Sequence, residues 1–443
     1  MVKIGIMLWL LGLLVLEGEG QPVTKAAAGS YHSLFLKSDG SLWGMGYNAS
    51  GQLGDGTYNT TNRPEIIITN GVIALASGEY FSLFLKSDGS LWGTGDNIYG
   101  QLGNNTGNFT DRPAQIVASN VVAVAAGYYH TLFLRTNGSL WGLGYNFDGE
   151  LGDGTNLNSR TPVLIEGGNV TAIAAGALHS LFLKSDGSLW AMGGNANGQL
   201  GDGSTNGTYL PELIEPGGVA AIAAGAMHSL FLKSDGSLWG MGFNRFGQLG
   251  DGSTNDVDMP EQMMASNVTA IAAGWIHSMF VQRGGNLWVM GNNHYGQLGN
   301  GTYSDSHNPG QIATKPVTAI VAGHYHSLFA TSDGGLWAMG DNYYGQLGGG
   351  KFNSTNQPNV PELVMAGPSG YNQISSQLLN GGLVQLAFVG IAGLNYALDQ
   401  TSTLSPPNWI GQATNPAGVG GVLWFTNTPD PLDNNFWRIR SVP

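Results

Sequence analysis

A period of 49 residues constrains this chain more than any other feature of its sequence. Seven tryptophans recur at this spacing, and seven prolines keep the same period. Each copy reads approximately V-x-A-I-A-A-G-x-x-H-S-L-F-L-K-S-D-G-S-L-W-G-M-G-x-N-x-x-G-Q-L-G-D-G, then a variable loop and P-x-x-I. Equal copies of this length predict a repeat architecture in which each copy is one supersecondary unit. The tryptophans are Trp43, Trp92, Trp141, Trp190, Trp239, Trp288 and Trp337.

Four short strands fit each copy, and the 71 glycines of the chain argue against long helices. In the fourth copy, Asp186-Gly187 suits a tight turn between two strands. Four short strands per copy are typical of a propeller blade. The sequence therefore predicts an all-β fold with a seven-bladed β-propeller over residues 21–366. The strands predicted for that copy are residues 170–175, 179–183, 188–192 and 211–214.

The ends of the repeat region suggest how the ring closes. Residues 361–365 look like a surplus strand, and we expect them to complete the sheet begun by residues 23–28. Glycine inside a strand often marks close packing. We therefore expect Gly142 and Gly144, beside Trp141, to permit close approach of neighbouring blades.

The repeated blocks A-A-G-x-x-H-S-L, D-G-x-L-W-G-x-G-x-N and G-Q-L-G-D-G resemble the regulator of chromosome condensation repeat family over about residues 23–366. That resemblance implies a seven-bladed β-propeller. The chain looks like an exported bacterial-type member. Such members include a propeller that inhibits β-lactamases by covering the active-site entrance with an aromatic-rich face. The resemblance thus implies a way of binding but identifies no partner.

Two segments lie outside the repeats. Residues 1–20 read as a signal peptide, because Lys3 precedes an apolar run over residues 4–16 and Gly18 and Gly20 precede Gln21. An uncleaved anchor is the alternative. We expect a secreted protein, extracellular or at the cell surface, without a membrane span. Residues 367–443 carry short alternating runs punctuated by proline, which predict a small β-sandwich-like module of about six strands.

The charge and composition of the chain limit the classes of partner and site that it can have. The chain carries 29 acidic and 16 basic residues, a net charge of −13, with no basic cluster, which argues against nucleic acid. Cysteine is absent, so disulfides and thiolate sites are excluded. We expect no cofactor and no metal, and a monomeric protein.

Two polar positions recur and invite a catalytic interpretation. A histidine occupies one position in six copies, and Phe81 replaces it in the second copy, which favours a structural role. An aspartate recurs in the G-D-G turn, where a turn-forming role is favoured over calcium binding. The residues are His32, His130, His179, His228, His277 and His326, and Asp55, Asp153, Asp202 and Asp251.

Two variable positions collect aromatic residues and form our candidate binding site. One is the x-x pair before the histidine, and the other is the x-N-x-x segment before G-Q-L-G. Equivalent positions of a propeller lie at equivalent heights, and clustered Tyr and Trp are typical of binding hot spots. The alternative is that these rings only cap the strand ends. The first position contributes Tyr31, Tyr80, Tyr128, Tyr129, Trp275 and Tyr325; the second contributes Tyr47, Tyr99, Tyr145, Phe147, Phe243, Phe246, Tyr295, Tyr343 and Tyr344. Small residues in the fourth and fifth copies predict a lopsided patch.

These features favour a secreted, non-catalytic binding propeller that recognises a protein, or a glycan, through an aromatic-rich face. A propeller-hosted enzyme acting on an extracellular polymer is one alternative, although its candidate residues are scattered over several copies. A guanine-nucleotide exchange factor-like regulator is another alternative, which the family resemblance implies. Exchange in that family resembles insertion of a wedge that projects from one blade, and the unbroken 49-residue spacing leaves little room for such an insertion. The enzyme candidates are Arg160, Arg245, His294, His307 and His324.

Overall fold

The computed structural model describes residues 21–312, 315–353 and 357–368, and the segments 374–378, 384–389, 395–401, 410–416, 422–427 and 436–442. All regular elements among them are strands. The chain divides into two compact units, one spanning Pro22–Ala366 and the other containing Gly367–Pro443. The predicted signal peptide lies outside the described residues. In this described part, no helix has the length and apolar character needed to cross a bilayer.

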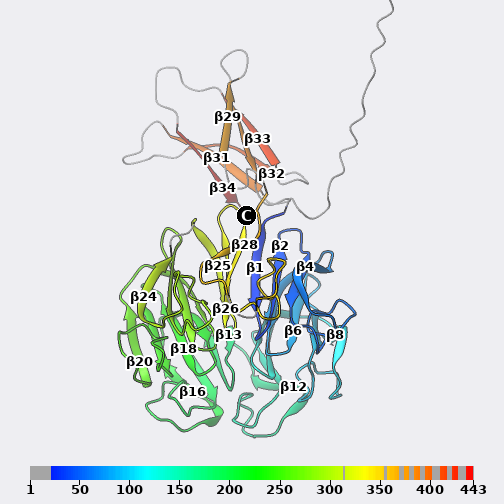
Figure 1. Cartoon of the computed structure of the whole chain (residues 1–443), viewed down its shortest axis with the longest axis vertical. Helices are drawn as coiled ribbons and strands as arrows, with labels where there is room; N and C mark the ends of the chain where they lie inside the picture. Colours follow the sequence, from blue (N-terminus) through cyan, green and yellow to red (C-terminus); the bar gives the residue numbers. More distant parts are fainter. Residues whose placement is uncertain are drawn as a thin grey trace, which may run out of the picture. The chain divides into compact units, whose positions relative to one another are not determined.

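Seven antiparallel four-stranded sheets make up the propeller, each from four consecutive strands (Figure 1). This confirms the predicted all-β, seven-bladed fold. The first strands, which surround the axis, are β1 (Val23–Ala28), β5 (Val72–Ser77), β9 (Val121–Ala126), β13 (Val170–Ala175), β17 (Val219–Ala224), β21 (Val268–Ala273) and β25 (Val317–Ala322). The second strands are β2 (His32–Lys37), β6 (Phe81–Lys86), β10 (His130–Arg135), β14 (His179–Lys184), β18 (His228–Lys233), β22 (His277–Gln282) and β26 (His326–Thr331).

The outer half of each blade has the same regularity. The third strands are β3 (Leu42–Gly46), β7 (Leu91–Gly95), β11 (Leu140–Gly144), β15 (Leu189–Gly193), β19 (Leu238–Gly242), β23 (Asn286–Gly291) and β27 (Leu336–Gly340). The fourth strands are β4 (Thr61–Ile68), β8 (Thr110–Val117), β12 (Ser159–Glu166), β16 (Thr208–Glu215), β20 (Val257–Met264), β24 (Ser306–Ile312) and β28 (Glu362–Met365).

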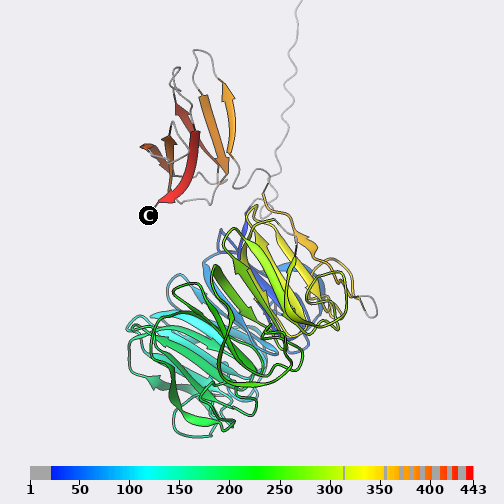
Figure 2. The same cartoon turned by 90° about the vertical axis from the view of Figure 1, so that its left-hand side faces the viewer.

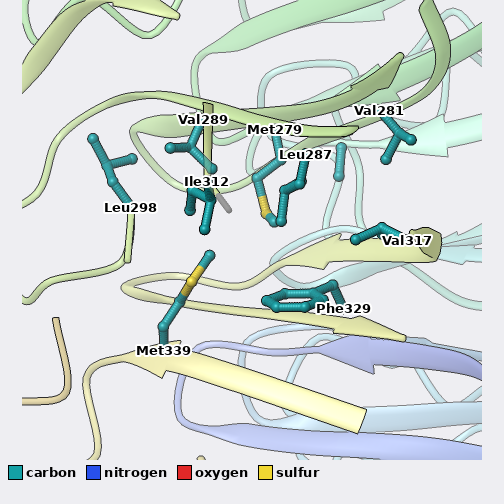
Figure 3. Packing of buried hydrophobic residues seen from close by; sticks show 10 residues of the cluster. Met279, Val281, Leu287, Val289, Leu298, Ile312, Val317, Phe329 and Met339 are labelled. Carbon is teal, nitrogen blue, oxygen red and sulfur yellow. The ribbon is translucent and has the colours of Figure 1, made fainter. Parts of the chain in front are cut away.

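Apolar side chains fill the interfaces between blades. In the interface of the sixth and seventh blades, Met279 and Leu287 pack with Phe329 and Met339 (Figure 3). The repeated tryptophans border these clusters: Trp337 lies against this one and stacks on Phe329. Because each copy supplies one half of two interfaces, the repeat buries its apolar surface only when blades stand side by side.

The expected closure by residues 361–365 is wrong. Strand β28 pairs with β27 inside the seventh blade, and β1 pairs only with β2 in its own sheet. The P-x-x-I strand is the outer strand of its own copy, so none is surplus. The first and last blades meet instead by packing, as in Val23 and Phe35 against Leu328. Strand β1 lies beside β25 of the last blade (Figure 1).

The recurring histidines connect neighbouring blades through hydrogen bonds, which confirms their structural role. All six are fully buried, and each Nε2 lies 2.8–2.9 Å from a serine Oγ of the next blade. Ser33 Oγ donates to the Gln346 carbonyl at 2.8 Å, so it accepts from His326 Nε2–H. Burial lowers the pKa of His326 to about 3, which keeps the ring neutral.

A ring of glycines surrounds the axis. A Cβ added to Gly176 would lie 2.3 Å from the His179 ring and 2.5 Å from the Gly225 carbonyl oxygen. The equivalent glycine of every blade meets the next blade in this way, ending with Gly323 against Gly29. The blades therefore approach closely at the glycines before the histidines. The seven glycines are Gly29, Gly78, Gly127, Gly176, Gly225, Gly274 and Gly323.

The expectation is wrong for Gly142 and holds in part for Gly144. A Cβ on Gly142 would meet Ile165, Leu151 and Leu132, which all belong to its own blade. Gly144 has a φ of +103°, and a Cβ there would lie 2.4 Å from the Tyr129 carbonyl oxygen of the same blade and 3.1 Å from Gln101 Cβ of the second blade. Gly142 therefore relieves crowding inside its own blade, whereas Gly144 also permits close approach of the neighbouring blade.

The second unit contains two three-stranded antiparallel sheets (Figure 2). One has the order β29-β30-β33 and the other β32-β31-β34. Leu398 and Phe425 are buried within this unit. Its strands are β29 (Ile374–Leu378), β30 (Val384–Val389), β31 (Asn395–Thr401), β32 (Ile410–Pro416), β33 (Val422–Asn427) and β34 (Phe436–Val442).

Candidate functional site

The two variable positions of the repeat meet at the same end of every blade. Pairing of the second and third strands sets His130 opposite Gly144, and the Tyr145 amide donates to the Tyr129 carbonyl at 2.9 Å. The same bond recurs in the first blade, from Tyr47 to Tyr31. Side chains from both positions therefore lie next to one another on one face of the propeller.

Aromatic rings form a connected network on this face. Tyr47 and Tyr344 have ring centroids 4.7 Å apart, and this contact joins the first blade to the seventh. Tyr99 and Tyr145 lie 4.9 Å apart across the second and third blades. Of the fifteen predicted aromatic residues, all but Phe243 and Phe246 are linked through such contacts, and His324 completes the chain of rings. We call these thirteen aromatics and His324 the aromatic face.

Rings from three blades converge at the centre of the aromatic face. Trp275 and His324 have centroids 3.7 Å apart, and Tyr128 lies 4.7 Å from Trp275. The Tyr128 hydroxyl is 3.1 Å from His324 Nε2. Burial lowers the pKa of His324 to about 3, so this imidazole is neutral at pH 7. The three side chains therefore form an uncharged cluster.

A cavity of about 160 Å³ lies at this end of the central channel. All seven blades line it with the ends of their first strands, including the glycine ring. Tyr128, Trp275 and His324 contribute bulky side chains, whereas Ala177 and Ala226 of the fourth and fifth blades contribute only methyl groups. The cavity is therefore lopsided, with aromatic side chains on some blades and small ones on others.

Glu79 is the one acidic residue among those lining the cavity. Its Oε2 is buried and has no hydrogen-bond partner among the described residues. Burial raises the pKa of Glu79, and hydrogen bonding from the Tyr129 and Tyr80 hydroxyls works against this rise. The charge of Asp96 raises it further. The carboxyl group is therefore partly buried, with one enclosed oxygen that has no hydrogen-bond partner among the described residues.

Further carboxylates surround the aromatic face. Asp96 and Asp341 occupy the position that Tyr47 holds in the first blade, and burial raises the pKa of both. Glu150 replaces the glutamine of G-Q-L-G, and burial raises its pKa to about 8, with Asp148 adding to the rise. Within the described residues, no ion pair involves any of these four groups. The face is therefore acidic as well as aromatic.

The fifth and sixth blades carry a separate group. Phe243 and Phe246 contact each other with centroids 6.0 Å apart, and Phe246 contacts His294. Arg245 lies 3.5 Å from Asp256 and over the Phe243 ring. This group shares the loop position of the aromatic face but has no described ring contact with it.

Of the residues considered for catalysis, Arg245 and His294 belong to this group of the fifth and sixth blades, away from the cavity. His294 pairs with Asp305, and Arg245 pairs with Asp256. His307 lies beside Gly247, Arg160 lies beside Gly100, and only His324 lines the cavity.

The recurring aspartates organise loops, as the turn-forming interpretation predicts. Asp153 Oδ1 accepts from Asn146 Nδ2 at 3.1 Å and from the Thr155 amide at 2.9 Å. Asp251 accepts in the same way from Asn244 and Ser253. No group of acidic or histidine side chains in the described part of the chain has the arrangement of a metal site.

Sequence reasoning missed Glu79 and considered His324 only as a catalytic candidate, not as a member of the binding site. Glu79 and His324 occupy the same variable position as Tyr128 and Trp275, directly after the channel glycine. The sequence-based binding site was defined by Tyr, Trp and Phe residues, so a carboxylate and an imidazole at the same position were left out of it. Comparing all seven residues at that position, without regard to type, identifies both.

Family models and solved structures resemble this chain over the propeller. The model "RCC1-like domain" matches residues 110–378, and two models of the "Regulator of chromosome condensation (RCC1) repeat" match residues 39–85 and residues 23–52 and 72–101. Human WBSCR16 superimposes with a TM-score of 0.64 at 25% identity, covering 70% of this chain and 87% of that one. Prp20p from Saccharomyces cerevisiae superimposes with a TM-score of 0.67 at 22% identity, covering 80% and 88%.

A curated relative matches over a shorter stretch. The X-linked retinitis pigmentosa GTPase regulator homolog of Caenorhabditis elegans is 42% identical over 57 residues, which are 13% of this chain and 4% of the relative. The stretch is little longer than one repeat, so it adds nothing on function. The RCC1-like model, in contrast, spans more than half of the sequence, and the seven blades agree with it. On these grounds the chain belongs to the RCC1-like domain family.

Proposed function

We propose that this propeller is a non-catalytic binding module that recognises a protein partner through the aromatic face. The observation that carries the proposal is the connected network of partly exposed rings from several blades. Tyr and Trp supply large contact area with little loss of conformational entropy, and their polar tips form hydrogen bonds. Because neighbouring rings brace each other, little ordering is required when a partner binds.

Charge favours a protein with a basic surface over a glycan. Asp96, Asp341 and Glu79 contribute carboxyl groups to a face whose described residues give them no ion-pair partner. Complementary charge on a partner speeds association and fixes its orientation. The fold is compatible with this role, since Prp20p was described with its binding properties to Gsp1p and histones.

The most exposed rings of the face provide the variant for testing. Phe147, Tyr295 and Tyr343 are 63%, 38% and 54% exposed, so their truncation costs the fold little. The chain and its Phe147→Ala/Tyr295→Ala/Tyr343→Ala variant serve as baits for proteins from the source organism. Leu164→Ala/Leu213→Ala, at exposed positions of β12 and β16, is the control. We expect the aromatic variant alone to lose the captured protein. Equal capture by all three baits contradicts the proposal.

Export of the chain belongs to the same proposal. It is supported by the apolar run over residues 4–16 and the small residues before Gln21. Mass spectrometry of the protein recovered from the culture medium is the test, and we expect Gln21 at its amino terminus. Recovery only in the cytoplasm with residues 1–20 intact contradicts export.

A further inference from the structure

The cavity at the end of the channel, which we call the socket, has a volume that can hold one extended side chain. Its volume of about 160 Å³ is too small for a folded element, and its walls come from backbone and methyl groups of the glycine ring and its neighbours. Those walls cannot move inward or outward, because the channel glycines already contact the next blade closely. The socket is therefore a fixed feature of the propeller.

The chemistry of the socket is that of a cation site. Glu79 supplies the only carboxylate among the lining residues, and none of them is Lys or Arg. His324, nine-tenths buried, has a neutral ring whose Nδ1 has no partner among the described residues, so it adds no positive charge. A partly buried carboxylate without a counter-ion is costly, and a bound cation removes that cost.

Aromatic side chains also line the socket. Tyr128 and Trp275 line the cavity, and their contact with His324 holds all three rings in place. Aromatic faces attract ammonium groups, more strongly when water is excluded. A carboxylate together with an indole and a phenol ring is a combination that favours a cation over a neutral side chain.

We propose that this socket receives a lysine side chain of the partner protein, with Glu79 as its counter-ion. This inference rests on the proposed function and specifies which contact lies at the centre of the interface. Lysine is favoured over arginine because Glu79 offers one unpartnered oxygen, which suits a compact ammonium, whereas a guanidinium binds best to two oxygens at once. The acidic surroundings of the aromatic face attract the same charge.

The test uses n-butylammonium, which reproduces the lysine side chain, and measures its Kd by saturation-transfer NMR at fixed ionic strength. We expect saturable binding, at least ten-fold weaker binding of the neutral n-butanol, and weaker binding of n-butylguanidinium. Glu79→Gln should weaken n-butylammonium binding at least ten-fold. Asp148→Asn removes a carboxyl group that does not line the cavity and should change Kd less than two-fold.

A second variant separates loss of the socket from loss of the fold. Ala226→Leu places a larger side chain at a position that lines the cavity and should abolish n-butylammonium binding while Glu79 remains in place. Melting curves of each variant establish that the propeller is intact. Unchanged binding in Glu79→Gln or Ala226→Leu, equal affinity for n-butanol, or tighter binding of n-butylguanidinium overturns the lysine socket. If the aromatic-face variant still loses its partner in that case, the proposed function stands and only the socket fails.

Discussion

His326 Nε2 lies 2.9 Å from Ser33 Oγ, although 293 residues separate them in the chain. Other neighbouring blades are joined by the same histidine–serine contact, and this pair provides it where the last blade meets the first. The last blade is therefore held to the first by the same kind of His–Ser pair that joins five of the other six blade interfaces, without an exchanged strand.

Removing the serine at the closure should destabilise the ring. Ser33→Ala leaves the buried His326 Nε2 without a partner, which we expect to cost about 1–3 kcal/mol of unfolding free energy. Urea unfolding measures this loss. Thr131→Val is the matched control, because the preceding blade has Phe81 in place of histidine and Thr131 bonds only to the Gln101 carbonyl. A loss in Ser33→Ala no greater than in Thr131→Val would show that the pair does not close the ring.

Stability should fall on acidification below about pH 6.5. Burial lowers the pKa of five of the six interface histidines to about 3 and that of His179 to about 4, so the unfolded chain binds protons first. The free energy of unfolding therefore decreases between the unfolded-state histidine pKa of about 6.5 and these folded-state pKa values. The decrease is about 1.4 kcal/mol per histidine for each pH unit. Unfolding measured from pH 7.5 to 4.5 checks this.

His179→Phe is the control for this pH dependence. It imitates Phe81 and should reduce the slope of stability against pH by about one proton. An identical slope in the variant and the parent would contradict a neutral, buried His179.

Glu150→Gln should stabilise the propeller. Burial raises the pKa of Glu150 to about 8, so the folded state resists ionisation and stability falls as pH rises from about 4.5 to 8. Glutamine is the residue at this position in the other six copies, and its Oε1 accepts the same kind of amide bond there. We expect a gain of about 1–3 kcal/mol at pH 8 and little at pH 4.5.

Gln199→Glu is the reverse experiment, since it introduces a buried carboxyl group at the same position of the fourth blade, where its ionisation is costly. It should lower the melting temperature more at pH 8 than at pH 4.5. If Glu150→Gln gains equally at both values, packing and not ionisation explains the difference.

The glycine ring should not tolerate a methyl group. Gly176→Ala sets a Cβ 2.5 Å from the Gly225 carbonyl, and rigid backbone on both sides prevents relief. Gly167→Ala meets nothing within 4 Å and should leave the melting temperature unchanged or slightly raised. Differential scanning calorimetry compares the two. Similar melting temperatures would contradict the close approach of the blades at the axis.

The repeated residues made the fold predictable, because an error in one copy is corrected by six others. The closure was predicted wrongly for a related reason. The repeat has no natural starting point, and the position of β28 in its blade depends on pairing that the period alone does not reveal. The function of Gly142 was misjudged because spacing does not tell which neighbour covers a strand.

The aromatic face was partly predictable. Alignment of the copies predicted that each variable position forms a ring of side chains at one height, and the structure brings the two positions into contact, as in Tyr31 and Tyr47. It could not reveal that Tyr128 reaches across the channel to His324, because that contact depends on side chains from blades distant in the chain. Glu79 was missed because its importance comes from burial, not from its type.

The affinity of the captured partner is the most direct test of the central claim. Its Kd is measured by calorimetry for the parent, for Phe147→Ala/Tyr295→Ala/Tyr343→Ala and for Leu164→Ala/Leu213→Ala. Because binding hot spots of this type cost more than 1 kcal/mol each, we expect a loss of at least about 100-fold in the aromatic variant and less than about three-fold in the control. Equal affinities with unchanged melting curves would contradict binding through the aromatic face.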